Sequence, residues 1–215
     1  MALLYFLGIF VGMLIPIQTS VNSRLSQYTR SSFYASTVSF GVGTVCLIIL
    51  NLIINPHMLT PHFFTEQTFN YHWFVGGLLG VCFLTGNLLL LPRLGAALTV
   101  VITVAGQIMM GVVIDTLGLF GASQQPFTFF KAVGIVLLLI GILLMNQIPK
   151  DKLLHQSHSN LYIWLIIGFI FGCAPPIQTT INSALAKEVH SSFFASLVSF
   201  TIGTIALLIL TLIFH

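Results

Sequence analysis

Seven long apolar runs constrain the fold of this chain more than any other feature of its sequence. Each is about 20 residues long, the length at which an α-helix crosses a hydrocarbon core of about 30 Å. Because the runs are continuous and do not alternate between apolar and polar residues, they predict helices and not the strands of a barrel. The predicted spans are 3–22, 33–54, 72–91, 95–117, 131–148, 161–182 and 193–214.

The composition supports the same class of protein. Hydrophobic residues make up 57% of the 215 residues and charged residues 5%, and a chain of this length cannot hide that much apolar surface from water. We therefore predict an all-α, polytopic membrane helical bundle. The net charge of +3 is too small and too scattered to predict binding to nucleic acid.

The chain contains an internal repeat without gaps. The polar stretch 16–23, Pro-Ile-Gln-Thr-Ser-Val-Asn-Ser, lies at the end of span one and returns as 176–183, Pro-Ile-Gln-Thr-Thr-Ile-Asn-Ser, an offset of 160. Spans one and two therefore have counterparts in spans six and seven. The same offset relates Gly8 and Gly12 to Gly168 and Gly172, and Gly43-Thr44 to Gly203-Thr204.

The orientation of the two copies follows from the number of spans between them. Five predicted spans precede the second copy, so it enters the membrane in the opposite direction and the repeat is predicted to be inverted. Basic residues favour cytoplasmic loops, and five lie in the loops after spans one, three and five against two on the opposite side, which places the N-terminus outside. The five are Arg24, Arg30, Arg93, Lys150 and Lys152, and the two are Lys131 and Lys187.

Polar side chains at matching places of the two copies predict a transport pathway. Pro16 removes a backbone donor, and Gln18 and Asn22 follow it on one helical face. Polar, proline-interrupted segments in two inverted halves are typical of pathways in secondary transporters. Plain hydrogen bonding between helices is the open alternative, because amides in lipid need partners in any case. The predicted pathway residues are Gln18, Asn22, Asn87, Thr103, Gln107, Gln178 and Asn182.

Span four carries a narrow stripe of small and polar residues, which we expect to face the interior of the bundle. Asp115, at its outer end, is the only carboxylate within any predicted span. It is a candidate for a coupling carboxylate, and an interfacial or capping role is the alternative. The stripe consists of Gly95, Thr99, Thr103, Gln107, Gly111 and Asp115.

Several motifs together resemble the five-span YdcZ-type branch of the drug/metabolite transporter superfamily. The resemblance covers the whole chain and implies a bacterial inner (plasma) membrane protein that exports small molecules. It also implies that five-span units work as antiparallel pairs, made as separate chains or as a tandem fusion. The motifs are the segments 16–25, 39–44, 92–97, 106–107, 115–121 and 134–141.

The repeat divides the chain into unequal parts. We predict a first five-span unit at 1–150, a hydrophilic connector at 151–160, and the first two spans of a second, inverted unit at 161–215. Counterparts of spans three to five would have numbers beyond His215, so we expect the second unit to be incomplete. The stripe from Thr99 to Gln107 would then face lipid or a second molecule, because the helices expected to cover it are missing.

The resulting prediction is an exporter-like transporter of an unidentified small molecule. Its expected partners are the lipid bilayer, the substrate, and either further copies of the chain or a second five-span chain. The alternative is a non-transporting or truncated subunit that needs a partner to complete its bundle. We expect no enzyme, cofactor or metal site, because no His-Glu-x-x-His motif, paired carboxylates or Ser/His arrangement lies within the spans.

Overall fold

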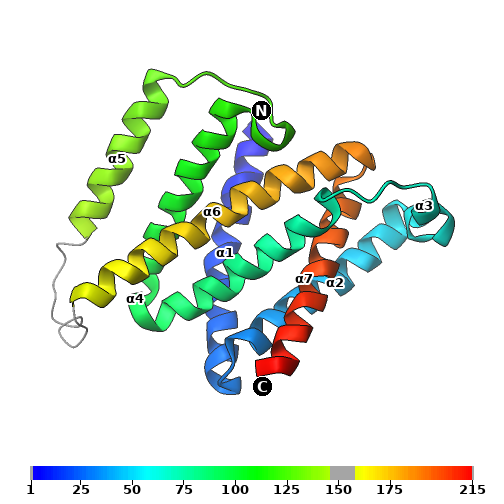
Figure 1. Cartoon of the computed structure of the whole chain (residues 1–215), viewed down its shortest axis with the longest axis horizontal. Helices are drawn as coiled ribbons and strands as arrows, with labels where there is room; N and C mark the ends of the chain where they lie inside the picture. Colours follow the sequence, from blue (N-terminus) through cyan, green and yellow to red (C-terminus); the bar gives the residue numbers. More distant parts are fainter. Residues whose placement is uncertain (1, 146–157, 215) are drawn as a thin grey trace.

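The computed structural model describes residues 2–145 and 158–214, and the regular secondary structure in these ranges is entirely helical (Figure 1). The all-α prediction is confirmed. The long helices are α1 (Ala2–Thr29), α2 (Ser32–Ile54), α4 (His72–Leu117), α5 (Phe129–Met145), α6 (His158–Glu188) and α7 (Ser192–Phe214). The short ones are η1 (Pro56–Leu59), α3 (Pro61–Thr65) and η2 (Leu119–Gly121).

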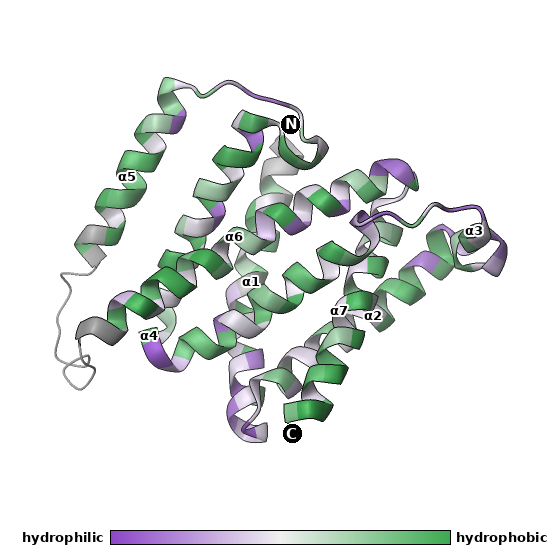
Figure 2. Cartoon of the chain, in the orientation of Figure 1, coloured by the Kyte–Doolittle hydropathy of each residue, from purple (hydrophilic) through white to green (hydrophobic). Residues whose placement is uncertain are grey.

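Long apolar helices dominate the molecule, as a membrane bundle requires. Figure 2 shows hydrophobic colours along the helices and hydrophilic colours mainly near their ends and in the connections. Phe129–Ile142 is a shorter apolar helix. These helix lengths are consistent with a membrane helical bundle. The total of seven spans stays a prediction. By length and composition, four helices in the described ranges could cross a membrane: Ser32–Ile54, His72–Leu117, Leu161–Glu188 and Ser192–Phe214.

Helix α4 contains two of the predicted spans, joined at a sharp break. Gly95 there has φ 75° and ψ 165°, a backbone conformation that is readily available only to glycine. Figure 1 shows the two parts of α4 diverging, and we call residues 72–94 the first limb and 96–117 the second limb. Gly95, expected to be the first residue of the polar stripe, forms the break instead.

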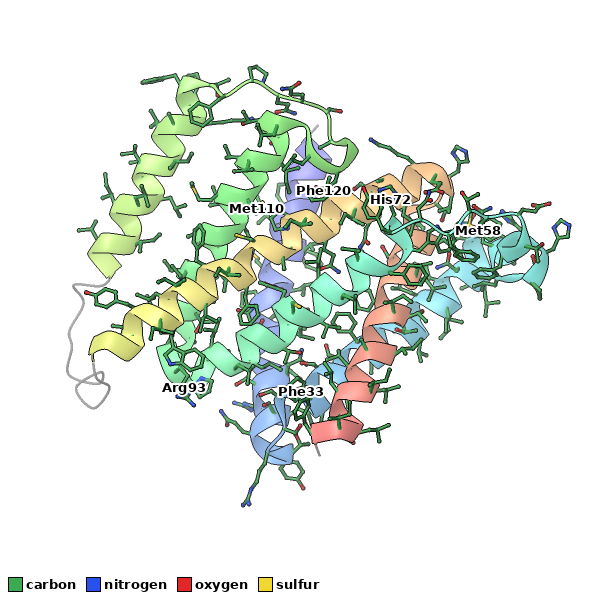
Figure 3. All side chains as sticks on the ribbon, viewed as in Figure 1. Phe33, Met58, His72, Arg93, Met110 and Phe120 are labelled. Carbon is green, nitrogen blue, oxygen red and sulfur yellow. The ribbon has the colours of Figure 1, made fainter. Side chains whose placement is uncertain are left out.

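Helix α6 packs closely against both limbs of α4 because small residues line the contact. A Cβ atom at Gly80 would lie 2.7 Å from Gln178 Nε2, and one at Gly168 would lie 2.8 Å from a methyl carbon of Ile102. On the second limb, a Cβ atom at Gly172 would collide with the backbone of Thr103. Arg93 lies near the bend (Figure 3), with its guanidinium 4.9 Å from the centre of the Trp164 ring on α6.

The second helices of the two copies, α2 and α7, pack antiparallel through equivalent residues. Thr44 and Thr204 share a hydrogen bond of 2.9 Å between their hydroxyl oxygens, and the rings of Phe40 and Phe200 stack with centroids 4.9 Å apart. Towards the far end of α7, Thr37 bonds Thr211 at 2.9 Å, so residue numbers fall along one helix as they rise along the other. When two elements are related by a two-fold axis, equivalent residues near the axis contact each other. The contacts of α2 with α7 follow this pattern.

The turns that precede α2 and α7 are also alike. Arg30 and His190 occupy equivalent positions and have φ angles of 55° and 57°. The serine after each one caps the next helix: Ser31 Oγ accepts a hydrogen bond from Tyr34 N and Ser191 Oγ accepts one from Phe194 N, both at 3.2 Å. The repeated sequence therefore adopts the same local structure twice.

The expectation that the stripe of span four lacks a protein cover is wrong. Thr99 and Thr103 are only 2% and 3% exposed, because α6 crosses the second limb. The bare surface lies on α1 instead. A Cβ atom at Gly8 or Gly12 would meet nothing within 4 Å, although the equivalent glycines of α6 are covered.

The boundary between the two predicted units falls largely outside the described residues. Positions 146–148 of predicted span five and 151–157 of the connector lie there. Helix α6 begins at His158, before the predicted start of span six at residue 161. The division into units stays a prediction.

Candidate functional site: a cavity between the two copies

A cavity of about 710 Å³ lies among helices α1, α2, α4, α6 and α7. This volume is in the range of small-molecule sites. Three of the predicted pathway residues, Gln18, Gln178 and Asn182, line it. Because Gln18 belongs to the first copy and the other two to the second, the cavity lies at the junction of the repeat.

The two glutamines are held by the same hydrogen bond in each copy. Gln18 Nε2 donates to Ser39 Oγ at 3.3 Å, and Gln178 Nε2 donates to Ser199 Oγ at 3.3 Å. In both cases the first helix of the copy is tied to its second helix.

The two asparagines differ. Asn22 is 6% exposed, and its Nδ2 donates to Ser39 Oγ at 3.0 Å. Asn182 Oδ1 is buried without a hydrogen-bond partner among the described residues, and its Nδ2 has none there either. Its Oδ1 lies against Gly76, where a Cβ atom would collide with it. Asn22 thus acts as a link between helices, whereas Asn182 leaves its amide free at the cavity.

A proline segment of α6 forms the wall between this cavity and a smaller one of about 320 Å³, because Pro175 and Thr179 line both. Two prolines in succession remove two backbone donors from the helix. The hydroxyls of Thr179 and Thr180 donate to the carbonyl oxygens of Pro175 and Pro176, each at 2.8 Å. Gln107 and Asp115 lie on the smaller cavity.

Asp115 is paired with a lysine. Its Oδ2 lies 3.8 Å from Lys131 Nζ on α5, and the two side chains are 47% and 22% exposed, respectively. The backbone carbonyl of Asp115 also accepts a hydrogen bond from Gln125 N at 2.8 Å. This arrangement favours the interfacial role, and ion coupling through Asp115 stays a prediction.

The comparison with protein families decides the identity of the chain. A family model described as "Putative inner membrane exporter, YdcZ" matches residues 3–144 and 163–215. The chain belongs to this family. The resemblance seen in the sequence is thereby confirmed. No curated protein and no solved structure matches the chain in the corresponding comparisons.

Membership of the YdcZ family places the chain in a family of membrane proteins described as exporters, which is a transporter family. It also supports a multi-pass protein of the inner membrane. Within the described ranges, no group of three or more His, Cys, Asp or Glu side chains could hold a metal ion.

The remaining predicted pathway residues of this YdcZ-family chain line neither cavity. Thr103 is buried against α6, and its Oγ1 donates to the carbonyl of Thr99 at 2.9 Å. Asn87 is half-buried, and Asn22 serves the link described above. Their part in transport stays a prediction.

The sequence reasoning did not select Phe40, Phe83, Lys187 or Phe200, which also line the larger cavity. Phe40 and Phe200 could have been found, because they are related by the offset of 160. Phe83 and Lys187 lack such a signal, since only the packing of α4 and α6 brings them to the cavity.

Proposed function

We propose that this YdcZ-family chain is an exporter that moves a small molecule across the inner membrane through the cavity between its two copies. The observation that carries the proposal is the position of Gln18 and Gln178, which are equivalent residues of the two copies and line one cavity. Transporters built from inverted repeats bind their substrates where the repeats meet.

We further propose that the repeat is inverted and that the chain crosses the membrane seven times with its N-terminus outside. The antiparallel packing of α2 and α7 through Thr44 and Thr204 supports inversion. The distribution of lysine and arginine supports the orientation. The first limb and the second limb of α4 are then separate spans, joined at Gly95.

The proposed pathway includes Gln18, Gln178 and Asn182 in the larger cavity and Gln107 in the smaller one. The wall at Pro175 and Thr179 separates the two cavities. Since prolines weaken the helical hydrogen bonding there, this wall is the element that would move if the cavities joined during transport. Asn22 supports the pathway by linking α1 to α2, because its Nδ2 donates to Ser39 Oγ.

A partner is part of the proposal. Gly168 and Gly172 of α6 are covered by α4, whereas the equivalent Gly8 and Gly12 of α1 have no neighbours within 4 Å. A further copy of the chain or a separate five-span chain would cover α1. The alternative function, a subunit that does not transport without such a partner, rests on the same bare surface.

Flux through the full chain in liposomes tests the proposal. We expect time-dependent uptake of at least one compound from a panel of radiolabelled metabolites and fluorescent drugs, above the rate in protein-free liposomes. The double variant Q18A/Q178A should reduce this uptake at least tenfold, because it removes the paired amides from the cavity. Uptake equal to that of protein-free liposomes for every compound would exclude autonomous transport and leave the subunit alternative. Uptake that the double variant does not change would exclude the pathway.

A further inference from the structure

We propose that the larger cavity binds a small organic anion with an apolar ring, and that it discriminates against cations. This inference deepens the proposed transport function, on which it rests. It follows from three features of the lining: its charge, its free hydrogen-bond donor and its aromatic rings.

Lys187 is the charged side chain of the cavity lining. It forms no ion pair with any residue in the described parts of the chain. The neighbouring carboxylate, Glu188, is engaged elsewhere: its Oε2 lies 3.8 Å from His72 Nδ1, and its Oε1 accepts a hydrogen bond from Asn70 Nδ2 at 3.3 Å. Figure 3 shows His72 near the end of α6. Lys187 therefore has its charge available for a ligand.

No aspartate or glutamate is among the residues that line the larger cavity. Asp115 lines the smaller cavity and is paired with Lys131. A cation in the cavity would therefore lack a counter-charge and would be repelled by the like charge of Lys187. An anion would find one in Lys187.

The amide of Asn182 adds a donor. In the first copy the equivalent amide of Asn22 is used by Ser39, but in the second copy Ser199 receives its hydrogen bond from Gln178 alone. Asn182 Nδ2 makes no hydrogen bond to a described residue and, unlike Oδ1 of the same amide, is not buried, so it can donate to a ligand oxygen in the cavity. A carboxylate accepts hydrogen bonds from both an amide and an ammonium group.

Aromatic rings provide the apolar part of the site. Phe40, Phe83 and Phe200 line the same cavity, and the first and last of them form the stacked pair between α2 and α7. Flat apolar groups pack favourably against such rings. The lining therefore combines a cationic group and an amide donor with aromatic rings, which matches an aromatic monocarboxylate.

The repeat offers a matched pair of variants. Lys187 corresponds to Gln27 of the first copy, so K187Q gives the second copy the residue that the first copy already holds. Q27K is the reciprocal control, since Gln27 does not line the cavity. Neither position is within the helix contacts of α4 with α6 described above, so both variants should remain folded.

The test measures binding of three probes of the same size and shape to the full chain in detergent. Benzoate, benzamide and benzylamine carry a negative, a neutral and a positive group on one ring, and isothermal titration calorimetry gives their dissociation constants. We expect benzoate to bind about tenfold more tightly than benzamide, because a charge-assisted hydrogen bond is roughly twice as strong as a neutral one. Benzylamine should bind more weakly than both.

In K187Q the preference for benzoate over benzamide should disappear while benzamide binding is retained, and Q27K should behave like the original chain. Equal binding of benzoate and benzylamine by the original chain, or an unchanged preference in K187Q, would overturn the inference. Binding is measured without transport, so absence of flux together with this pattern would contradict only the proposed function. Flux without any preference for benzoate would contradict only the ligand class.

Discussion

At the scale of single residues, the two copies show how one sequence motif can serve two purposes. Asn22 and Asn182 occupy equivalent positions, yet the first is hydrogen-bonded to Ser39 and the second has no partner among the described residues. In the second copy the Asn182 amide oxygen lies against Gly76 of α4, and Ser199 accepts its hydrogen bond from Gln178. We infer that Asn22 stabilises the packing of α1 against α2, whereas Asn182 is available to bind a ligand.

This difference predicts that the same substitution changes stability at one site and not at the other. N22A should lower the free energy of unfolding by about 0.5 to 1.5 kcal/mol, because it removes a hydrogen bond between α1 and α2. N182A should leave it within about 0.5 kcal/mol of the original value, because no hydrogen bond is lost. Denaturant titration in micelles, followed by circular dichroism, measures both. A larger loss for N182A than for N22A would contradict the assignment.

The residues that sequence alone could predict are those marked by the repeat. Gln18 and Gln178 were identified from their matching positions, and both line the cavity. Lys187 was counted only as a loop charge, since nothing in its local sequence indicates that α4 and α7 enclose a space beside it. Membership of a cavity depends on contacts between distant helices, and no short motif encodes them.

At the scale of helices, glycine decides how closely two elements approach. Gly77 of α4 lies against the backbone of α7, where a Cβ atom would be 2.9 Å from Gly203 N. The hydropathy of the runs predicted which segments are helical. The predicted boundary between spans three and four is at 92–94, whereas the break within α4 is at Gly95, the first residue of predicted span four and of the stripe. Small residues indicate close approach in membranes, but they do not identify the helix that approaches.

Equivalent glycines provide the second comparison. G172A should lower the free energy of unfolding by about 1 to 3 kcal/mol, because the added methyl group would collide with the backbone of Thr103 and overpacking costs that much. G12A should be neutral or stabilise the chain by up to about 1 kcal/mol, because alanine favours the helix and nothing lies nearby. Unfolding in micelles again provides the measurement.

The result for G12A has a second use in native membranes. If a partner covers α1 there, the same substitution should reduce crosslinking to that partner while leaving the isolated chain stable. A destabilised isolated chain would show that α1 is already packed in its own molecule.

At the scale of the whole molecule, helices of the second copy pack against those of the first copy. Helix α6 covers the stripe that was expected to face lipid or a second molecule. The pattern of Thr99 and Thr103 indicates a buried face, but the repeat relates this face only to helices with numbers beyond His215, not to α6. A long-range contact between α4 and α6 could not be derived from periodicity.

The orientation of the molecule is tested by reporter fusions. We expect external signals from the N-terminus and from fusions at Pro56 and Gln124, and cytoplasmic signals from fusions at Arg30, Arg93 and Lys152. The reason is the excess of lysine and arginine on one side of the predicted spans. Alkaline phosphatase and green fluorescent protein report the two compartments. A cytoplasmic signal at Gln124 or an external one at Lys152 would contradict the inverted repeat.

Gly76, Gly77 and Gly80 form a small-residue surface on the first limb of α4. This surface has a consequence for synthesis on the ribosome. Gly77 packs against the region of Ser199 and Gly203, which is made more than a hundred residues later. At a translation rate of roughly 5 to 20 residues per second, on the order of 6 to 24 seconds pass between synthesis of Gly77 and synthesis of the part of α7 that packs against it. During that interval α4 can be inserted but not yet packed, and a small-residue surface is open to helices of other nascent chains. Slowed translation between residues 117 and 192 would lengthen the interval and increase the competition from such helices.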